Sequence, residues 1–332
     1  MRIGINGFGR VGRVFLRIAA ERGLEVVAVN DAADPATMAH LFAHDSTYGR
    51  PAAEVAYEDG TLLVDGRKIL MTRHTEPERL PWGELGVDLV IESTGRFRTR
   101  EQAAAHLTAG AGKVLMSAPA KGPVDATIVM GINQEFYDPQ EHDVVSNASC
   151  TTNCVAPMVD VLHRHFGLVH GFMTTVHAYT GDQRLLDAPH KDLRRARSAA
   201  GNIIPTTTGA ARTVGLVIRE VAGLLDGVAV RVPVPTGSLV DLAAVLRRPA
   251  GAEEVNAAFQ QESQDRLRGV LRIAEQGFVS SDVVGDPASC VFDAPLTQAQ
   301  GDLVKVFGWY DNEWGYCARL ADLAQYMGDR LG

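Results

Sequence analysis

Short apolar runs alternate with helical segments along the first part of the chain. The runs end in small or polar residues, as buried parallel strands do, and segments with helical spacing at 14–23 and 99–110 follow two of them. Such β-α-β alternation predicts a Rossmann-type doubly wound parallel sheet, in which ligands bind at the carboxyl ends of the strands. The runs are RIGIN (2–6), EVVAVN (25–30), DLVIESTG (88–95) and KVLMSAP (113–119).

A different pattern begins after about residue 170, where β-branched and aromatic residues are enriched and turn residues interrupt the runs. This pattern predicts a mixed or antiparallel sheet. The segments concerned are GFMTTVHAYT (171–180), GVAVRVPVP (227–235), SLVDLAAVL (238–246) and LVKVFGWYDNE (303–313).

The change of pattern predicts two domains, because 332 residues exceed the usual size of one hydrophobic core. We expect an α/β nucleotide-binding domain over 1–149 and an α+β catalytic domain over 150–313. The last segment, 314–332, returns to helical spacing, and we expect this helix to pack back on the first domain.

The turn after the first run carries the sequence GFGRVG, with Gly7, Gly9 and Gly12. A G-x-G-x-x-G sequence alone is weak, since an ordinary tight turn also fits it. Here it follows a strand and opens a helix, and Asp31 ends the next strand 19 residues after Gly12, so the context favours dinucleotide binding. Gly7 permits the turn, Gly9 lets a pyrophosphate approach the backbone, and Gly12 lets helix and strand pack closely.

Small polar residues end the next two strands of the same pattern. Ser93, Thr94, Gly95 and Ser117 stand at these carboxyl ends and are candidate cofactor contacts. Taken singly, each is equally well explained as a capping residue.

Composition removes several classes of function. A net charge of −8 and a pI near 5.7 disfavour a general nucleic-acid or anionic-membrane binder. No apolar run approaches the roughly 20 residues that span a bilayer. The N-terminal sequence MRIGINGFGR lacks a signal-peptide core, so we expect a cytoplasmic protein.

The four cysteines are too few and too scattered for a disulfide framework or a zinc site, so reduced thiols and no metal are expected. Two of them lie in NASCTTNC (147–154), and a helical pattern runs from there to Gly167. Cys150 would begin that helix, where the dipole stabilises a thiolate. Pro157 suggests irregular first turns, and Cys154 is best interpreted as a small buried hydrophobe.

A thiolate nucleophile needs a base, and His177 is the best candidate because it ends a β-patterned run in the same domain. Two stretches suggest an anion site: IIPTTTG (203–209) supplies hydroxyls and amides, and Arg231 lies inside an apolar strand. The alternative for Arg231 is the solvated face of a half-buried strand. The basic cluster 191–197 is expected to assist a substrate phosphate or subunit contacts.

Long motifs then point to one family. NASCTTNC, HAYTGDQR, PHKDLRRARSAAGNIIPTTTGAA, RVPVPTGS and WYDNEWGY, in this order, resemble the phosphorylating glyceraldehyde-3-phosphate dehydrogenases, and the resemblance covers essentially the whole chain. It implies NAD as cofactor, glyceraldehyde 3-phosphate and inorganic phosphate as partners, and 1,3-bisphosphoglycerate as product through a cysteine hemithioacetal and acyl-thioester, in glycolysis or gluconeogenesis. It also implies a homotetramer with the segment 179–201 between subunits.

The resemblance assigns roles position by position. Cys150 resembles the nucleophile and His177 its base. The substrate-phosphate pocket is implied at Thr180, Asp182 and Arg231, and the inorganic-phosphate side at Ser149, Thr151, Arg195, Thr208 and Gly209. The implied cofactor contacts are Arg10, Val11, Asp31, Ser117, Asn312 (on the nicotinamide carboxamide) and Tyr316 (near its ring).

Some positions depart from the family pattern. Thr75 stands where an arginine near the adenine is usual, with Arg73 two residues earlier, and Ala32 and Ala188 are small, so the preference for NAD over NADP is open. Arg212 replaces a usual lysine, a change that nothing explains. Two alternative functions remain: erythrose-4-phosphate dehydrogenase, and a non-catalytic binding module on the same scaffold.

Overall fold

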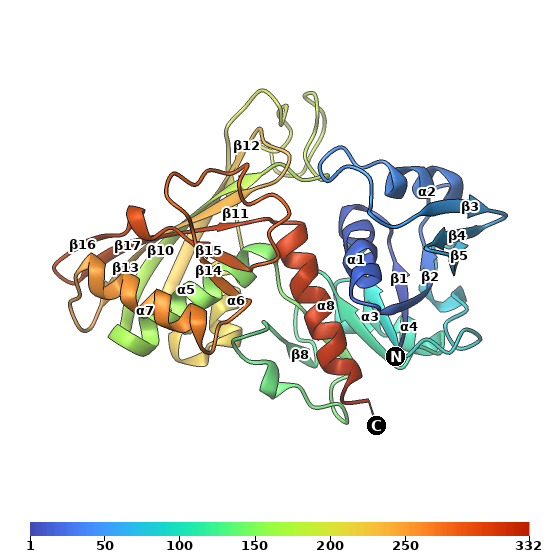
Figure 1. The fold of residues 1–332 in the computed structure, drawn as a ribbon, viewed down its shortest axis with the longest axis horizontal. Helices are drawn as coiled ribbons and strands as arrows, with labels where there is room; N and C mark the ends of the chain where they lie inside the picture. The colour runs from blue at the N-terminus through green and yellow to red at the C-terminus, as the bar shows by residue number, and fades with distance from the viewer. Residues whose placement is uncertain (332) are drawn as a thin grey trace. The chain divides into compact units, whose positions relative to one another are not determined.

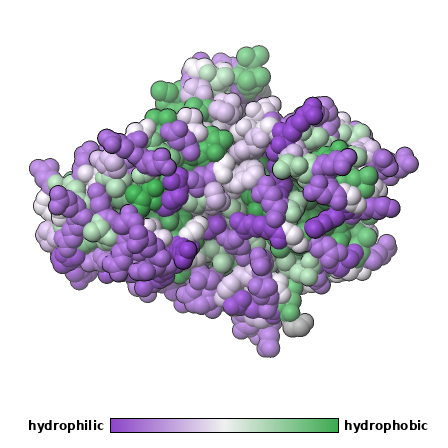
Figure 2. All heavy atoms as spheres, in the orientation of Figure 1, coloured by the Kyte–Doolittle hydropathy of each residue, from purple (hydrophilic) through white to green (hydrophobic). Residues whose placement is uncertain are grey.

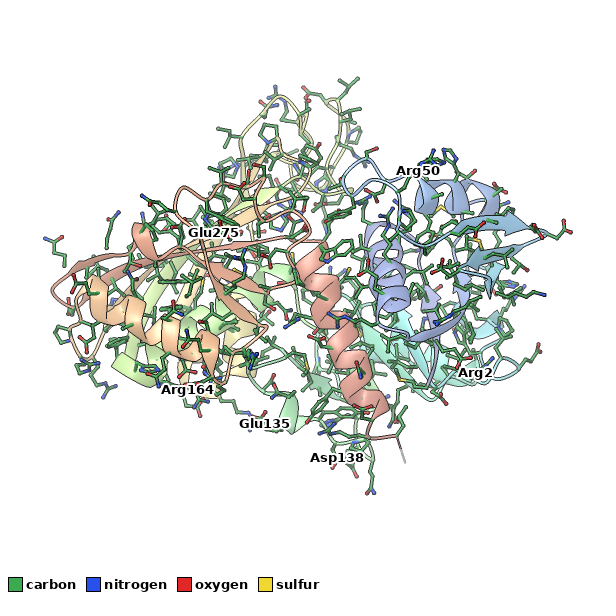
Figure 3. The ribbon with its side chains drawn as sticks, viewed as in Figure 1. Arg2, Arg50, Glu135, Asp138, Arg164 and Glu275 are labelled. Carbon is green, nitrogen blue, oxygen red and sulfur yellow. The ribbon has the colours of Figure 1, made fainter. Side chains whose placement is uncertain are left out.

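The protein is described by a computed structural model that covers residues 1–331 and divides into two units. The first unit comprises residues 1–128, 134–149 and 317 onward, and the second comprises 129–133 and 150–316. The short segment 129–133 belongs to the second unit, whereas the sequence pattern assigns it to the first domain, over 1–149. Charged side chains such as Arg2, Arg50 and Arg164 extend from the surface (Figure 3).

The first unit contains a nine-stranded sheet within the described residues, in the order β3-β4-β5-β2-β1-β6-β7-β9-β8 (Figure 1). From β5 to β8 all neighbours are parallel, which confirms the predicted doubly wound sheet. These strands are β1 (Arg2–Asn6), β2 (Glu25–Asn30), β5 (Arg67–Thr72), β6 (Leu89–Glu92), β7 (Lys113–Met116), β8 (Ala126–Thr127) and β9 (Val144–Ser146). The antiparallel edge strands β3 (Val55–Glu58) and β4 (Thr61–Val64) were not predicted, nor were the parallel strands β5, β8 and β9.

The helices of this unit follow the strands. α1 (Arg10–Glu21) begins directly after the glycine turn and buries Val14, Phe15 and Leu16. The predicted helix at 99–110 is in fact two short helices, α3 (Arg100–Ala103) and α4 (Ala105–Thr108). A tighter turn at Ala104, whose N–H also reaches the carbonyl of Gln102, separates them. The other helices are α2 (Pro35–Ala43), the 3-10 turns Pro77–Arg79 and Gln134–Phe136, and α8 (Trp314–Gly328), which belongs to this unit from residue 317.

The second unit contains an eight-stranded mixed sheet among the described residues, in the order β11-β12-β10-β13-β17-β15-β14, with β16 beside β17. β10 runs parallel to β12 and antiparallel to β13, so the expected mixed sheet is confirmed. The strands are β10 (Leu168–Ala178), β11 (Ile204–Thr207), β12 (Leu225–Val232), β13 (Ser238–Leu246), β14 (Leu271–Ile273), β15 (Cys290–Phe292), β16 (Gln298–Gln300) and β17 (Leu303–Tyr310).

The main helix of this unit, α5 (Cys150–Phe166), packs along the sheet and buries every residue from Thr151 to Leu162. Pro157 lies inside α5 without ending it, because burial of this length of helix offsets the hydrogen bond that proline cannot donate. The other helices are α6 (Ala210–Val217), α7 (Ala252–Gln264) and the 3-10 turns Arg219–Val221 and Ala294–Leu296. Within residues 1–331 no helix is long and apolar enough to cross a bilayer.

Candidate active site

The start of α5 and the end of β10 bring together Cys150 and His177. The sulfur of Cys150 lies 3.5 Å from Nε2 of His177. On the other side of the ring, Nδ1 lies 2.7 Å from the carbonyl oxygen of Ala178 and must donate to it. The neutral imidazole therefore presents an unprotonated Nε2 to the thiol, which is the arrangement of a nucleophile with its base.

Both groups are uncharged in this environment. Burial raises the pKa of the Cys150 thiol, although the positive charge of Arg231 and hydrogen bonds with Thr151 act in the opposite direction. The sequence predicts a thiolate favoured by the helix dipole, but burial is the larger effect here. Burial and the charge of Arg231 lower the pKa of His177 to about 3, against the hydrogen bond to Ala178. His177 is thus a neutral base near pH 7.

Tyr310, the last residue of β17, holds this pair in place, and sequence reasoning missed it. Its hydroxyl lies 2.9 Å from Oγ1 of Thr151 on α5 and 2.8 Å from Oγ1 of Thr175 on β10. Its ring meets the ring of His177 edge-on, with centroids 5.9 Å apart. In the sequence Tyr310 is one more aromatic residue of an apolar strand, so only its place in the motif WYDNE could have drawn attention to it.

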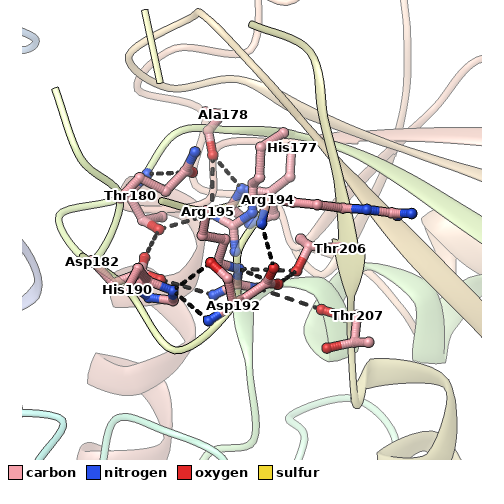
Figure 4. A network of polar contacts seen from close by, with 12 residues as sticks. His177, Ala178, Thr180, Asp182, His190, Asp192, Arg194, Arg195, Thr206 and Thr207 are labelled. Carbon is pink, nitrogen blue, oxygen red and sulfur yellow. Dashed lines mark hydrogen bonds and ion pairs between the residues drawn. The ribbon is translucent and has the colours of Figure 1, made fainter. Parts of the chain in front are cut away.

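The three residues predicted for the substrate phosphate, Thr180, Asp182 and Arg231, form one polar network with Arg195. Figure 4 shows Thr180, Asp182 and Arg195 in this network. Nη1 of Arg231 donates to Ala178 O (3.2 Å) and to Thr180 Oγ1 (2.8 Å). The hydroxyl of Thr180 bonds to Asp182, whose other oxygen accepts from Nη1 of Arg195 at 2.8 Å. Burial alone would raise the pKa of Asp182, but the hydrogen bond from Thr180 and the charge of Arg195 outweigh it and lower this pKa.

Arg231 is the member of this network with unused binding capacity. Its Nε is buried and has no hydrogen-bond partner in the described chain, and no carboxylate of residues 1–331 lies within ion-pair distance of it. Burial and the nearby charge of Arg195 lower the pKa of its guanidinium, which stays the cationic form at neutral pH. A buried cation with a free donor favours an anionic ligand.

The residues predicted for inorganic phosphate are only partly gathered here. Arg195 also reaches Thr206 Oγ1 (3.0 Å) and the carbonyl of Thr207 (3.4 Å), beside Thr208 and Gly209 at the start of α6. The hydroxyl of Thr208 accepts from Ala210 N, and that of Thr151 bonds to Tyr310. Ser149 belongs to the first unit.

Asn312 follows β17 and is fixed in orientation. Its Oδ1 accepts from Ser238 Oγ (2.8 Å), which leaves its amide N–H groups as donors for a ligand, while the hydroxyl of Thr236 donates to Asp311 Oδ1 (2.8 Å). Ser238 Oγ in turn accepts from the backbone N–H of Ala178. Ser238, which the sequence did not indicate, therefore joins Asn312 to the backbone beside His177. Tyr316 is buried, also in the second unit.

A separate cavity of about 220 Å³ lies within the first unit, at the carboxyl ends of its parallel strands. Five of the predicted cofactor residues line it: Gly7, Gly9, Asp31, Ser93 and Thr94. Residues not predicted as contacts line it too, namely Asn6, Asn30, His74, Pro77, Arg96 and Phe97, together with Ala32 and Thr75 of the departures noted above.

The other predicted cofactor residues of this unit do not line the cavity. The side chain of Arg10 pairs with Asp45 at 2.5 Å, and the carbonyl of Val11 accepts from Cys317. Ser117 uses its backbone N–H to bond Glu92 O. Gly12 packs against the turn, and Gly95 has a positive φ of 69° in the exposed loop after β6.

The glycine turn fits a dinucleotide pyrophosphate. Gly7 has φ +95°, and a Cβ there would lie 2.6 Å from the backbone nitrogen of Thr94, while a Cβ at Gly12 would lie 2.1 Å from Gly7 O. A Cβ at Gly9 would meet nothing within 4 Å, so this position faces free space at the N-terminus of α1, which has no side-chain cap. The carboxylate of Asp31 lines the same cavity and can accept hydrogen bonds from the hydroxyls of a ribose.

Comparisons with known proteins agree with this geometry. The family description "Glyceraldehyde 3-phosphate dehydrogenase, NAD binding domain" matches residues 1–100, and "Glyceraldehyde 3-phosphate dehydrogenase, C-terminal domain" matches residues 149–312. The chain is 58% identical to a glyceraldehyde-3-phosphate dehydrogenase of Streptomyces coelicolor, covering 100% of this chain and 99% of that protein. The enzyme of the same name from Geobacillus stearothermophilus is 54% identical, over 99% of this chain and 99% of that protein. The one from Mycobacterium avium is 52% identical, over 100% of this chain and 99% of that protein.

Proposed function

Because this chain belongs to the glyceraldehyde-3-phosphate dehydrogenase family of NAD-dependent oxidoreductases, we propose that it oxidises D-glyceraldehyde 3-phosphate to 1,3-bisphosphoglycerate with Cys150 as nucleophile. The observation that carries this proposal is the 3.5 Å contact between the sulfur of Cys150 and Nε2 of His177, with the ring held by Ala178.

The first step is addition of Cys150 to the aldehyde carbon. As the carbon–sulfur bond forms, the thiol proton passes to Nε2 of His177, which is free to accept it. The imidazolium then protonates the carbonyl oxygen to give a hemithioacetal. Because both resting groups are neutral, the charge separation is needed only during reaction, not in the free enzyme.

Oxidation and phosphorolysis follow on the same sulfur. NAD, when bound, supplies the acceptor for the hydride that leaves the carbon of the hemithioacetal. His177 takes the hydroxyl proton of the hemithioacetal, so that an acyl-thioester remains on Cys150. An oxygen of inorganic phosphate then attacks the thioester carbon, the carbon–sulfur bond breaks, and the proton held by His177 returns to the sulfur.

Two arginines supply the anion sites. Arg231, with its unused Nε, is proposed to bind the phosphate of the aldehyde together with Thr180 and Asp182. Arg195, beside Thr208 and Gly209, is proposed to hold inorganic phosphate near the thioester. Arg195 already pairs with the carboxylates of Asp182 (2.8 Å) and Asp192 (3.8 Å), whereas Arg231 has no carboxylate within ion-pair distance in the described chain, so Arg231 is the cation with charge left for an anion.

Trapping the acyl-enzyme tests the chemistry directly. Enzyme incubated with NAD and glyceraldehyde 3-phosphate, but without inorganic phosphate, should carry the acyl group on Cys150 in intact-mass spectra, and added phosphate should remove it. Cys150→Ser should show no adduct and no turnover, while still binding NAD. An adduct on another residue, or normal turnover by the serine variant, would contradict the assignment.

Erythrose 4-phosphate is the competing substrate, and a non-catalytic role is the competing function. NADH formation with each aldehyde, with and without phosphate, distinguishes them. We expect phosphate-dependent turnover with a higher kcat/KM for the three-carbon aldehyde. A preference for the four-carbon aldehyde would select the first alternative, and no turnover with either would select the second.

Apolar side chains exposed on the second unit support assembly into the proposed homotetramer. Leu185, Leu186 and Leu193 are at least 75% exposed in the loops after β10, where Figure 2 shows apolar atoms at the tip, and Phe172 is 70% exposed on the sheet. Such patches on a lone chain indicate a protein interface. Light scattering during gel filtration should give four times the chain mass. The cytoplasmic location stays a prediction from the sequence.

A further inference from the structure

Four polar side chains form a row across the carboxyl ends of neighbouring strands in the first unit. Thr72, Asn30, Asn6 and Glu92 end β5, β2, β1 and β6, and each is in register with the next. Asn30, Asn6 and Glu92 are 2–3% exposed. None of this follows from the dinucleotide fingerprint, and a buried row of this kind in a parallel sheet must be fully hydrogen-bonded to be tolerated.

The hydrogen bonds of the row run in one direction. The hydroxyl of Thr72 donates to Asn30 Oδ1 (2.9 Å), Nδ2 of Asn30 donates to Asn6 Oδ1 (2.8 Å), and Nδ2 of Asn6 donates to Glu92 Oε2 (2.7 Å). The carboxylate of Glu92 is thus the terminal acceptor. Because it can only accept, it sets the amide orientation of Asn6. Asn30 is held both by Asn6 and by the backbone of His74, whose N–H donates to Asn30 Oδ1 (2.8 Å) and whose carbonyl accepts from Asn30 Nδ2 (3.0 Å).

A histidine and a tryptophan complete the end of the row. Trp82 Nε1 donates to His106 Nδ1 at 3.0 Å, and an indole nitrogen can only donate. His106 Nε2 therefore carries the ring proton and donates to Glu92 Oε2 at 3.0 Å. His106 and Trp82 are fully buried, so this tautomer has no competing partner in water.

The second oxygen of Glu92 shapes the cavity wall. Glu92 Oε1 accepts from the backbone N–H of Thr94 (2.8 Å) and from its hydroxyl (2.5 Å). The turn that begins there, 93–97, contributes Ser93, Thr94, Arg96 and Phe97 to the cavity lining. Glu92 therefore holds both Asn6, which lines the cavity, and this wall.

We propose that Glu92 and His106 are positioning residues for the cofactor: they fix the orientation of Asn6 and Thr94 before the cofactor arrives. A buried acceptor of this kind is not needed for stability, since apolar side chains of similar size would pack as well. Preorganised polar groups do raise affinity, because no further conformational entropy is lost in orienting them when the ligand binds. This inference rests on the proposed assignment of the cavity to NAD.

Glu92→Gln is the informative change because it keeps the shape and removes one acceptor. Donors face both oxygens, Thr94 N–H on one side and Asn6 and His106 on the other, so either orientation of the new amide sets N–H against N–H. We expect the dissociation constant for NAD, measured by fluorescence or calorimetry, to rise roughly tenfold or more. The kcat at saturating NAD should change less than about twofold, because the reacting groups are untouched.

A second change should restore binding. In Asn6→Asp/Glu92→Gln the carboxylate moves one position along the row: Asp at 6 accepts from Asn30 Nδ2, from the new glutamine amide and from His106 Nε2, which lies 3.4 Å from Asn6 Nδ2 in the native chain. The glutamine oxygen still accepts from Thr94 N–H. We expect the double variant to bind NAD several-fold more tightly than Glu92→Gln, an outcome that simple loss of packing does not produce.

Val144→Ala is the matched control. Val144 is fully buried on β9 of the same sheet, and its partner on the neighbouring strand β7 is Val114, which does not belong to the row. This variant should lower the unfolding midpoint but leave the dissociation constant for NAD within about twofold. If Glu92→Gln weakens binding only as much as this equally destabilised control does, the inference is wrong.

Four further outcomes are decisive. Wild-type affinity for NAD in Glu92→Gln, or no gain in affinity in the double variant, would contradict the positioning role of Glu92 and His106 while leaving the proposed function intact. Failure of the wild-type protein itself to bind NAD overturns the proposed function instead. If Glu92→Gln does not fold, Thr72→Val tests the other, half-buried end: NAD should bind several-fold more weakly, and an unchanged dissociation constant contradicts the proposal.

Discussion

The sulfur of Cys150 lies 3.5 Å from Nε2 of His177, although 27 positions separate the two residues in the chain. The contact arises because α5 begins where the adjacent strand β10 ends. Since Ala178 O holds Nδ1 of the ring as a donor, the neutral ring of His177 presents Nε2 to the thiol as a proton acceptor.

His177→Asn should therefore lower kcat/KM by roughly 10²- to 10⁴-fold, because the asparagine cannot accept the thiol proton. Steady-state kinetics with saturating phosphate measure the loss. His170→Asn is the control, since His170 is exposed on the same strand, and it should stay within about twofold of the wild type. A loss below about tenfold in His177→Asn would indicate another base.

The low pKa of His177 also predicts how stability depends on pH. The folded pKa is about 3 and the ordinary value 6.5, so between these pH values the unfolded chain binds the extra proton and folding is disfavoured as pH falls. In urea unfolding at pH 7 and pH 4.5, the stability gap between wild type and His177→Asn should narrow by about 1.4 kcal/mol per pH unit below 6.5. Parallel stability curves would show that His177 is not held neutral.

Arg231→Leu should raise the KM for the phosphorylated aldehyde at least tenfold, because the phosphate of the substrate loses the buried guanidinium, with its unused Nε, that is proposed to bind it. The KM for NAD should change little. Arg164→Leu is the control, since Arg164 is exposed on α5 and pairs only with Asp160 (Figure 3). If the KM for NAD rises instead, Arg231 is assigned to the wrong ligand.

Tyr310→Phe should lower kcat several-fold and destabilise the protein by about 1–3 kcal/mol, because the buried hydroxyls of Thr151 and Thr175 both lose their partner. Kinetics and urea unfolding measure the two effects. The matched control is Tyr137→Phe: the hydroxyl of Tyr137 is buried without a partner in the described chain, so its removal should cost nothing. Equal effects of the two substitutions on kcat and on unfolding would show that the hydroxyl of Tyr310 has no special role in the site.

Cofactor preference should follow Asp31. Its oxygens accept from Phe8 N (2.7 Å) and Ala33 N (2.9 Å), and a 2′-phosphate about 4 Å away would be repelled by roughly 4 kcal/mol per charge pair at an effective dielectric of 20, before relaxation and screening. We expect NAD to be preferred, with measurable NADP use that rises in Asp31→Ala.

Arg73 is the reason to expect some NADP use. Its Nε donates to the carbonyl of Ala32 at 3.0 Å, so the guanidinium is held against the residue that follows Asp31 in the chain. Arg73→Met should therefore lower kcat/KM for NADP more than for NAD. A wild type that prefers NADP, or an Asp31→Ala variant with an unchanged NAD-to-NADP ratio, would contradict this account.

The sequence by itself determined the central strands of both sheets, because buried strands carry apolar runs, and it determined that α1 starts after the turn with Gly7, Gly9 and Gly12. It also pointed to Cys150 and His177, whose types and motifs carry the chemistry. It did not indicate the edge strands β3 and β4, whose half-buried residues carry a weaker pattern.

Only the tertiary structure decided which polar groups meet. Tyr310 and Glu92 resemble ordinary strand residues in the sequence, yet the register of their sheets places one between Thr151 and Thr175 and the other at the end of a row of four strands. The protonation of the Cys150–His177 pair was likewise decided by burial, which outweighs the helix dipole. Hydrogen bonding and desolvation depend on neighbours brought together by folding, and local sequence does not encode their distances.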